Sequence, residues 1–487
     1  MKIEYLMDKE RRAQYQLLLT LYQSDKKLSL KEVMTLLKIS KVTLIKYIEN
    51  LNALFQESHL AYQLILANDF LLIEEEGNIT WEFILSVLLK DALSYRILLY
   101  LLGHEHFNIT SLSEDFLVSE ATFNRSLAHI NKYLEEFDIA IWQGKQIGSE
   151  LQWRYFFFEL LTLSFSKQEM QAFNRNVDQK NLSLIAQRFL GLDMTENQLE
   201  KLSLWLAISQ RRLSFNREKS FSDQKDLDFI EKHVFFKRLE KVILHYLRRY
   251  AIEYDTFEAK SLFIFLQSYA VLPVPSMEYI LGFGGPIADK ISESLWLLRR
   301  AHIIGHRTKE EIIYNLGLYF SRTYFFKGAI LNQEFKKEKL LSLRTTEDRE
   351  KIEVILRHLL IQAGDHRLQD SDLASYLSYK LLELIIFSIE RQHKVLKVGL
   401  DFGHDVVENA MAELTIRKHL EDNGNFIFAP YQKGESFDCL ISYRNSNGQG
   451  NLPYYQLKSY TWNLELEALE QFLKKELGSK NKEEDSL

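Results

Sequence analysis

Apolar positions near the start of the chain recur at helical spacing and predict three short helices in succession. The first helix covers residues 11–23. The second begins at Ser29, because Ser29 and Glu32 have the spacing of a capping box. The third begins after Ser40, and its inward positions are Leu44, Ile48 and Leu51. Two helices joined by so tight a turn form a helix-turn-helix, whose second helix enters the major groove of DNA.

The helix after the turn has an outward face that suits DNA. The candidate DNA contacts on this face are Lys41, Val42, Thr43, Ile45 and Lys46. The helix before the turn is expected to bury the stripe Val33, Leu36 and Leu37. Segment 62–77 then alternates apolar and polar residues as a β-hairpin does, in the position of a wing. We therefore expect a winged helix-turn-helix domain over residues 1–80.

A second copy of this pattern predicts another winged helix-turn-helix domain over residues 81–164. Ser111 and Glu114 repeat the capping-box spacing, and the later Ser119 corresponds to Ser40. A second wing hairpin follows. Asparagine and arginine have the hydrogen-bonding groups that match adenine and guanine edges. The candidate DNA contacts of this second recognition helix are Asn124, Arg125 and His129.

The rest of the chain divides into a helical middle and a mixed C-terminal part. All five prolines lie late, at Pro273, Pro275, Pro286, Pro430 and Pro453. Because proline interrupts helix interiors, its absence before residue 273 permits a long helical region. The proline- and glycine-containing segment 272–286 predicts a connection between domains. From residue 394 a strand, a helix over 406–420 and two further strands predict a small α/β unit with a parallel sheet.

Size and charge restrict the class of protein. The 487 residues suggest about three domains or more, and a hydrophobic content of 46% excludes a chain that is disordered over most of its length. The net charge of −6 excludes a uniformly basic nucleic-acid coat, so any basic surface is local. Residues 26–48 carry six lysines against one glutamate, a local charge of +5 that suits phosphate contacts. Residues 104–148 carry a charge of −4, which leaves protein contacts open as the role of the second domain.

The sequence lacks the residues that several kinds of site and motif require. The single cysteine, Cys439, excludes an intramolecular disulfide and a cysteine-based zinc site, and it fits a reducing cytoplasm. No signal peptide is visible, and no apolar run approaches the ~20 residues of a membrane span. The sequence has no phosphate-binding loop and no hydrolase or metalloprotease motif. We expect a cytoplasmic protein with no enzymatic activity, catalytic residue, metal site or cofactor, and no membrane partner.

The order of these parts resembles, over nearly the full length, the Mga/AtxA family of global virulence regulators of Gram-positive bacteria. The local signatures are KISKVTLIKYIENLN, VSEATFNRSLAHINKYL and the wing-to-helix junction GKQIGSELQWRYFFFELL. The resemblance implies a DNA-binding transcriptional regulator, an activator of virulence or metabolic genes, with double-stranded DNA as its partner. It implies a multidomain, mainly α fold. The two winged helices would be followed by helical domains similar to PRDs, the regulatory domains of the sugar phosphotransferase system, over 165–280 and 287–392. An EIIB-like α/β domain over 393–487 would form a homodimer or higher homo-oligomer.

The resemblance also implies a phosphocarrier protein of that system as a partner, but two departures bear on it. No histidine shortly precedes Arg212 or Arg322, where related regulators carry their phosphorylated histidine. The remaining candidate phosphohistidines are His233 and His245 in the first helical domain and His302, His306, His358 and His366 in the second. The loop after the first C-terminal strand holds His404 where catalytic EIIB domains carry a cysteine.

Other functions stay open from the sequence. A winged-helix scaffold that binds only proteins would fit the acidic second domain. An RNA-binding antiterminator of the same lineage would begin with a small β module, whereas this chain begins with helices. An EIIB-type phosphotransferase would need the missing loop cysteine. If the protein binds DNA, it reads either the bases or the shape of the duplex.

Overall fold

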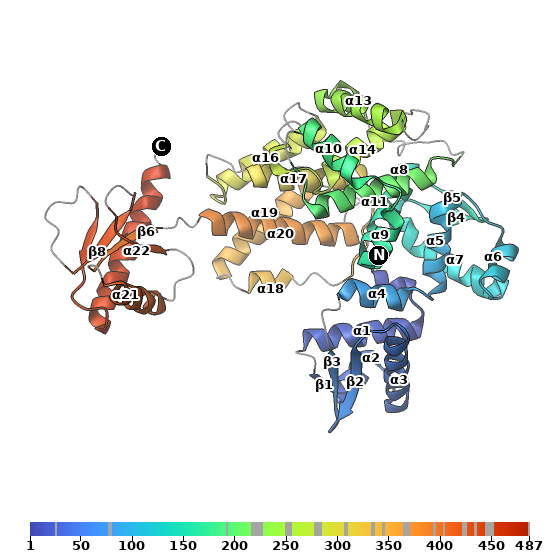
Figure 1. Ribbon diagram of the computed structural model, residues 1–487, viewed down its shortest axis with the longest axis horizontal. Coiled ribbons are helices and arrows are strands. Elements are labelled where there is room, and N and C mark those ends of the chain that lie inside the picture. The colour runs from blue at the N-terminus through green and yellow to red at the C-terminus, as the bar shows by residue number, and fades with distance from the viewer. Residues whose placement is uncertain are drawn as a thin grey trace. The chain divides into compact units, whose positions relative to one another are not determined.

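The structure is a computed structural model, and the residues that it describes are mainly helical, with three small sheets among them (Figure 1). It describes residues 1–24, 27–75, 80–190, 193–215, 227–248, 256–276, 285–305, 310–332, 337–342, 346–363, 371–392, 396–402, 405–420, 426–432, 436–443 and 452–485. The chain forms two compact units. One comprises Met1–Leu295 and Lys309–Glu383, and the other comprises Trp296–Thr308 and Leu384–Leu487. In the described part of the chain, no helix is both long enough and apolar enough to cross a membrane.

The first winged helix forms as the apolar pattern predicts. Its elements are α1 (Lys9–Gln23), β1 (Lys27–Ser29), α2 (Leu30–Leu37), α3 (Lys41–Glu57), β2 (Tyr62–Ala67) and β3 (Phe70–Glu75). The strands form an antiparallel sheet in the order β1-β3-β2. The capping box of Ser29 and Glu32 is present at the start of α2. The three predicted inward residues of α3, Leu44, Ile48 and Leu51, are buried.

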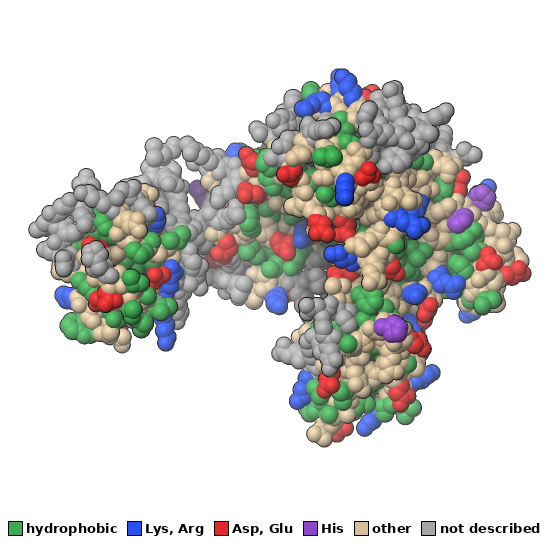
Figure 2. All heavy atoms as spheres, viewed as in Figure 1, with side chains coloured by type: hydrophobic (Ala, Val, Ile, Leu, Met, Phe, Trp, Pro, Cys, Tyr) green, Lys and Arg blue, Asp and Glu red, His purple; other side chains and the backbone are tan. Residues whose placement is uncertain are grey.

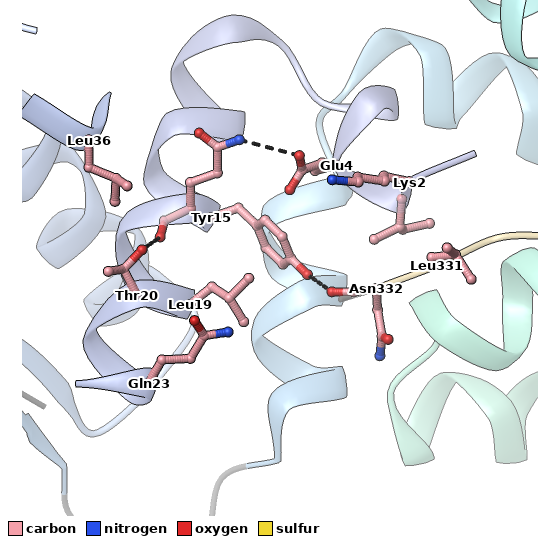
Figure 3. Close-up of a pocket in the computed structure, with 11 residues that line it drawn as sticks. Lys2, Glu4, Tyr15, Leu19, Thr20, Gln23, Leu36, Leu331 and Asn332 are labelled. Atoms are coloured by element: carbon pink, nitrogen blue, oxygen red, sulfur yellow. Dashed lines mark hydrogen bonds between the residues drawn. The ribbon is translucent and has the colours of Figure 1, made fainter. Parts of the chain in front are cut away.

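The expected buried stripe of α2 is only partly correct. Val33 is buried and Leu37 is half-buried, but Leu36 is 53% exposed. Leu36 lies on the rim of a hollow of about 310 Å³ beside α1 (Figure 3). On the far side of this hollow the Tyr15 hydroxyl donates to the carbonyl of Asn332, and burial raises the pKa of Tyr15 to about 12.

The second winged helix repeats the arrangement with shorter strands. It comprises α4 (Trp81–Leu89), α5 (Leu93–Gly103), α6 (Ile109–Asp115), α7 (Glu120–Leu134), η2 (Glu135–Phe137), β4 (Ala140–Trp142) and β5 (Lys145–Ile147). The predicted capping box of Ser111 and Glu114 is wrong. The side chain of Asn108 accepts a hydrogen bond from the Ser111 amide at 3.1 Å, so α6 begins at Ile109 and Ser111 lies inside it. In the first domain β1 pairs with the second wing strand, β3. In the second domain a single bridge, between His106 and Lys145 of β5, takes the place of that pairing.

The helical middle is built around α8 (Glu150–Ser164), which is buried on nearly all sides. Its further elements are α9 (Lys167–Asn174), α10 (Gln179–Leu190), α11 (Glu196–Arg212), α12 (Asp228–Lys232), α13 (Val234–Arg248), α14 (Thr256–Ser268), η3 (Val274–Ser276), α16 (Pro286–Arg300), α17 (Glu310–Phe325), α18 (Lys337–Leu341), α19 (Thr346–Ala363) and α20 (Asp372–Gln392). The short helix η1 (Ile3–Leu6) lies at the start of the chain, before α1. Trp153, Phe156 and Phe157 of α8 are buried, and the Trp153 ring contacts the rings of the other two. The expected connection at 272–286 lies partly outside the described residues.

The C-terminal part contains the predicted parallel sheet. Its elements are β6 (Leu396–Asp401), α21 (Val406–His419), β7 (Phe426–Pro430), β8 (Cys439–Ser442), β9 (Tyr454–Gln456) and α22 (Asn463–Asp485). The strand order is β7-β6-β8-β9, and all three pairings are parallel. Cys439 is buried in the core of this sheet, as its place in an apolar strand predicts. His404 lies outside the described residues.

Candidate nucleic-acid interface

The two predicted recognition helices, α3 and α7, begin with the same cap. The Thr43 amide donates to Ser40 Oγ at 3.2 Å. In the second domain the Thr122 amide donates to Ser119 Oγ, also at 3.2 Å. The two hydroxyls of each pair lie 2.9 Å apart in α3 and 3.0 Å apart in α7. Because the cap fixes where a helix starts, both helices present their first turn in the same way, and Thr43 serves the cap.

Each recognition helix is fastened to its wing by one asparagine. Asn52 donates to the carbonyl of Leu64 at 3.0 Å and accepts from the Leu64 amide at 2.8 Å. Asn131 makes the same two bonds with Ile141, at 2.8 and 2.7 Å. Neither asparagine is among the residues predicted from the sequence. The signal that finds them is their position, since each follows its capping serine at the same interval.

The turns before the two recognition helices also share a backbone conformation. Lys38 has a φ of 53° and Leu117 has a φ of 57°, both in the left-handed region. This region costs a residue with a Cβ roughly 1–2 kcal/mol. Leu117 is 93% exposed, so no burial of its side chain explains its presence there. The backbone path of the helix-turn-helix therefore requires this conformation in both domains, although the side chains at the two positions differ.

The outward face of α3 is basic and apolar. Lys41, Val42 and Lys46 are exposed, with Val42 at 79%, and Ile45 is half-buried. Asp69, at the tip of the wing between β2 and β3, lies with Oδ1 3.9 Å from Lys41 Nζ. The wing tip therefore brings a carboxylate beside a predicted phosphate contact. Figure 2 shows basic and acidic side chains interspersed over this domain.

The outward face of α7 separates the three predicted contacts. Asn124 and Arg125 are exposed on the first two turns. The Arg125 guanidinium donates to the Ala121 carbonyl at 3.3 Å and to Thr122 Oγ1 at 3.1 Å. His129 is half-buried, and its Nε2 lies 2.8 Å from the carbonyl oxygen of Tyr5. His129 thus faces η1, apart from the other two.

The second wing continues directly into a buried ion network that involves the helical middle. Arg212, the last residue of α11, donates to both carboxylate oxygens of Glu150 at 2.8 Å. The same guanidinium donates to Gln146 Oε1 in β5 at 2.8 Å and to the Leu101 carbonyl in α5 at 3.2 Å. Burial alone would raise the pKa of the Glu150 carboxyl, but the charges and hydrogen bonds of Arg212 and Arg154 outweigh it and lower that pKa. One side chain of the helical middle therefore contacts three elements around the second wing.

Two further arginines hold α8 by the same kind of contact. Arg154 donates to both oxygens of Glu258 in α14, at 2.6 and 2.8 Å. Arg322 in α17 lies 2.5 Å from Glu159. The carboxylates of Glu258 and Glu159 balance the positive charges of the two arginines. Burial alone would lower the pKa of Arg322, but the negative charge of Glu159 outweighs it and raises that pKa. No histidine shortly precedes Arg212 or Arg322 in the sequence. Both of these arginines form ion pairs with glutamates of α8.

The candidate phosphohistidines lie in different surroundings. His233 is buried, and its Nδ1 accepts a hydrogen bond from the Phe235 amide at 3.2 Å. His302 is exposed in a turn with a φ of 56°. His245 belongs to α13, but its side chain lies outside the described part of the chain, as does the whole of His306.

Comparisons with known proteins agree with the winged-helix pair. A family model described as the M protein trans-acting positive regulator (MGA) HTH domain matches residues 9–60. A second, the Mga helix-turn-helix domain, matches residues 77–161. No curated protein matches the chain. The two matched ranges contain α3 and α7 with their caps, and they confirm the resemblance drawn from the sequence. The N-terminal part of the chain therefore carries the helix-turn-helix domains of Mga-type regulators, which supports a DNA-binding transcriptional regulator.

Proposed function

We propose that this protein is a transcriptional activator of virulence or metabolic genes that binds duplex DNA through α3 and α7 together. The observation that carries the proposal is the repeated mounting of the two helices. Each has a serine cap, a left-handed turn residue before it and an asparagine that fixes its wing. Two helices held so alike are suited to the same task, and the task of such a helix is to enter the major groove.

Phosphate contacts by lysine supply most of the affinity in this proposal. Lys41 and Lys46 are exposed on α3, within a segment whose sequence carries a charge of +5. Each phosphate neutralised by a lysine or arginine releases counterions, so binding weakens as salt rises. Asn124 and Arg125 then add contacts to base edges from α7. His129 and Thr43 support the geometry, because each already has a partner within the protein.

The C-terminal unit is proposed to join two copies of the chain. On α21, Val407, Met411 and Leu414 are exposed at helical spacing. The opposite face of the same helix buries Ala412 and Ile416. An exposed apolar stripe favours a protein partner, and a two-fold dimer would match the two-fold geometry of duplex DNA.

Control by the phosphocarrier protein is proposed to act on an accessible histidine. His302 and His358 are the exposed candidates among the histidines whose side chains the structure describes, whereas His233 is buried. A phosphoryl group would bring about −1.5 to −2 charges. Within the unit that begins at Met1, Arg212 of the helical middle contacts β5 and α5 of the second winged helix.

The test of DNA binding measures affinity for a candidate promoter and a random duplex across a salt series. The full chain should bind with a steep salt dependence. The double substitution Lys41→Ala and Lys46→Ala should lower the slope of log K against log salt by about 2, since each phosphate contact contributes about 0.9. Lys237→Ala with Lys241→Ala, two exposed lysines of α13, is the matched control and should leave the slope unchanged. No binding by the folded wild type would favour a scaffold that binds only proteins.

A further inference from the structure

The two recognition helices are mounted alike but carry different chemistry at equivalent positions. The shared cap and wing contacts place Val42 and Ala121 at one equivalent position, and Ile45 and Asn124 at another. Likewise Lys41 corresponds to Glu120 and Lys46 corresponds to Arg125. A difference in what the helices recognise therefore comes from their side chains.

We infer that the target is a composite duplex: thymine methyl groups are read by α3, and the N7 edges of purines are read by α7. The inference rests on the proposed function, and it adds which base chemistry each domain takes. It also gives the two domains different roles: the first supplies affinity for duplex DNA, and the second discriminates between base sequences.

The face of α3 selects thymine because its uncharged groups are aliphatic. Val42 is 79% exposed, and Ile45 lies one turn further along the same face. An apolar side chain in the major groove gains from contact with the C5-methyl group, which only thymine presents there. The lysines beside them are point charges without the planar fork that fixes a bidentate contact. Lys41 is in addition drawn toward Asp69, at 3.9 Å.

The face of α7 has the groups that bond to purines. The amide of Asn124 can pair with N6 and N7 of adenine, and the guanidinium of Arg125 can pair with O6 and N7 of guanine. Both side chains are exposed and lie one residue apart. Arg125 is held against its own helix by Thr122 Oγ1 at 3.1 Å, which keeps the guanidinium near the start of α7, where recognition helices meet base edges.

Charge makes the second domain selective. The sequence around α7 carries a charge of −4, and Glu120 is exposed at its first position. A carboxylate near phosphates is repelled, so α7 gains little from an arbitrary duplex. It should engage firmly only where base contacts offset that repulsion. The first domain, with its basic segment, binds many sequences.

The experiment uses the full-length protein and the duplex that it selects from a randomised pool. The selected duplex is prepared in three forms: unmodified, with uracil in place of thymine, and with 7-deazapurines in place of adenine and guanine. Uracil lacks only the methyl group and 7-deazapurines lack the N7 acceptor. The wild type should lose about fourfold in affinity for a missing methyl contact. It should lose about 2- to 13-fold for each missing hydrogen bond to N7, because N6 or O6 keeps the other bond of the bidentate contact.

Two variants assign these losses to the two helices. Val42→Ser with Ile45→Ser should bind the thymine and uracil duplexes alike and keep the 7-deazapurine loss. Asn124→Ala with Arg125→Ala should keep the uracil loss and bind the purine and 7-deazapurine duplexes alike. Val354→Ser with Ile361→Ser, two exposed apolar residues of α19, and Lys132→Ala, on the last turn of α7, are the matched controls and should behave as the wild type.

The outcomes separate the inference from the proposed function. Equal wild-type affinity for all three duplexes, selection of no consensus from the pool, or losses that the variants do not remove would overturn the composite target while DNA binding stands. Failure of the folded wild type to bind any duplex would overturn the proposed function, and the inference with it.

Discussion

Arg212 places its Nε and Nη2 nitrogens on the two carboxylate oxygens of Glu150, each at 2.8 Å, although the residues lie 62 positions apart in the chain. Glu150 is the first residue of α8, directly after the second wing, and Arg212 is the last residue of α11. Both side chains are buried. This pair therefore joins α11 to α8 by a buried contact, and the same guanidinium bonds to Gln146 and Leu101 of the second winged helix.

Removal of the negative charge from this pair should destabilise the protein. Glu150→Gln leaves Arg212 with an uncompensated buried charge and weakens the contact with Arg154, and loss of one partner of a buried pair costs about 3–5 kcal/mol. Urea denaturation should show a lower midpoint. Glu413→Gln, which breaks a half-exposed pair with Arg417, is the control and should change stability by about 0–1 kcal/mol. Equal shifts in both variants would contradict a special role for the Glu150 pair.

The same pair should give stability an acid-dependent component. The folded-state pKa of Glu150 is lowered, so its ionised form is favoured by folding. Its contribution is complete above the unfolded-state pKa of about 4.3 and is lost as pH falls through the lower folded-state value. Thermal unfolding between pH 6 and pH 3 should therefore fall more steeply in the wild type than in Glu150→Gln. Parallel curves would mean that Glu150 does not titrate in this range.

How far the sequence predicts this structure depends on how local each signal is. The helices around Ser29 and Ser40 were predictable because caps and apolar spacing act within a few residues. Asn108 was missed as a cap because Ser111 and Glu114 also have capping spacing, and only the structure shows which residue starts the helix. The pair of Arg212 and Glu150 has no local signature, since each residue acquires its partner only when distant helices pack.

The carboxylate at the first wing tip should weaken DNA binding. Asp69 lies 3.9 Å from Lys41 and is largely exposed, so it offsets one cation of the proposed phosphate surface. Asp69→Asn should raise the affinity for duplex DNA about two- to fivefold at low salt, with a smaller gain at high salt, as expected for an exposed charge. Glu467→Gln on α22 makes the same change of charge elsewhere and should have no effect. An unchanged affinity in Asp69→Asn would place Lys41 outside the DNA contact.

The two wing asparagines should matter equally in the two domains. Asn52→Ala and Asn131→Ala each remove two hydrogen bonds to one strand residue and leave a backbone amide and carbonyl to find new partners. Each substitution should lower the free energy of unfolding by about 1–3 kcal/mol. DNA affinity should fall in both variants, measured at a temperature where both are folded. The control Asn50→Ala removes a single contact, with Glu10, and should cost less. A loss confined to one variant would show that the two wings do not contribute alike.

Self-association should depend on the exposed stripe of α21. Met411→Glu with Leu414→Glu puts two charges on a face that the proposed dimer would bury, while the buried Ala412 and Ile416 are left intact. Light scattering on the full-length protein should therefore give twice the chain mass for the wild type and the single-chain mass of about 58 kDa for the variant. Val354→Glu with Ile361→Glu, two exposed apolar residues of α19, is the matched control and should leave the mass unchanged. A variant that keeps the wild-type mass would show that α21 does not form the interface, and a wild type of single-chain mass would show that the isolated protein does not form the proposed dimer.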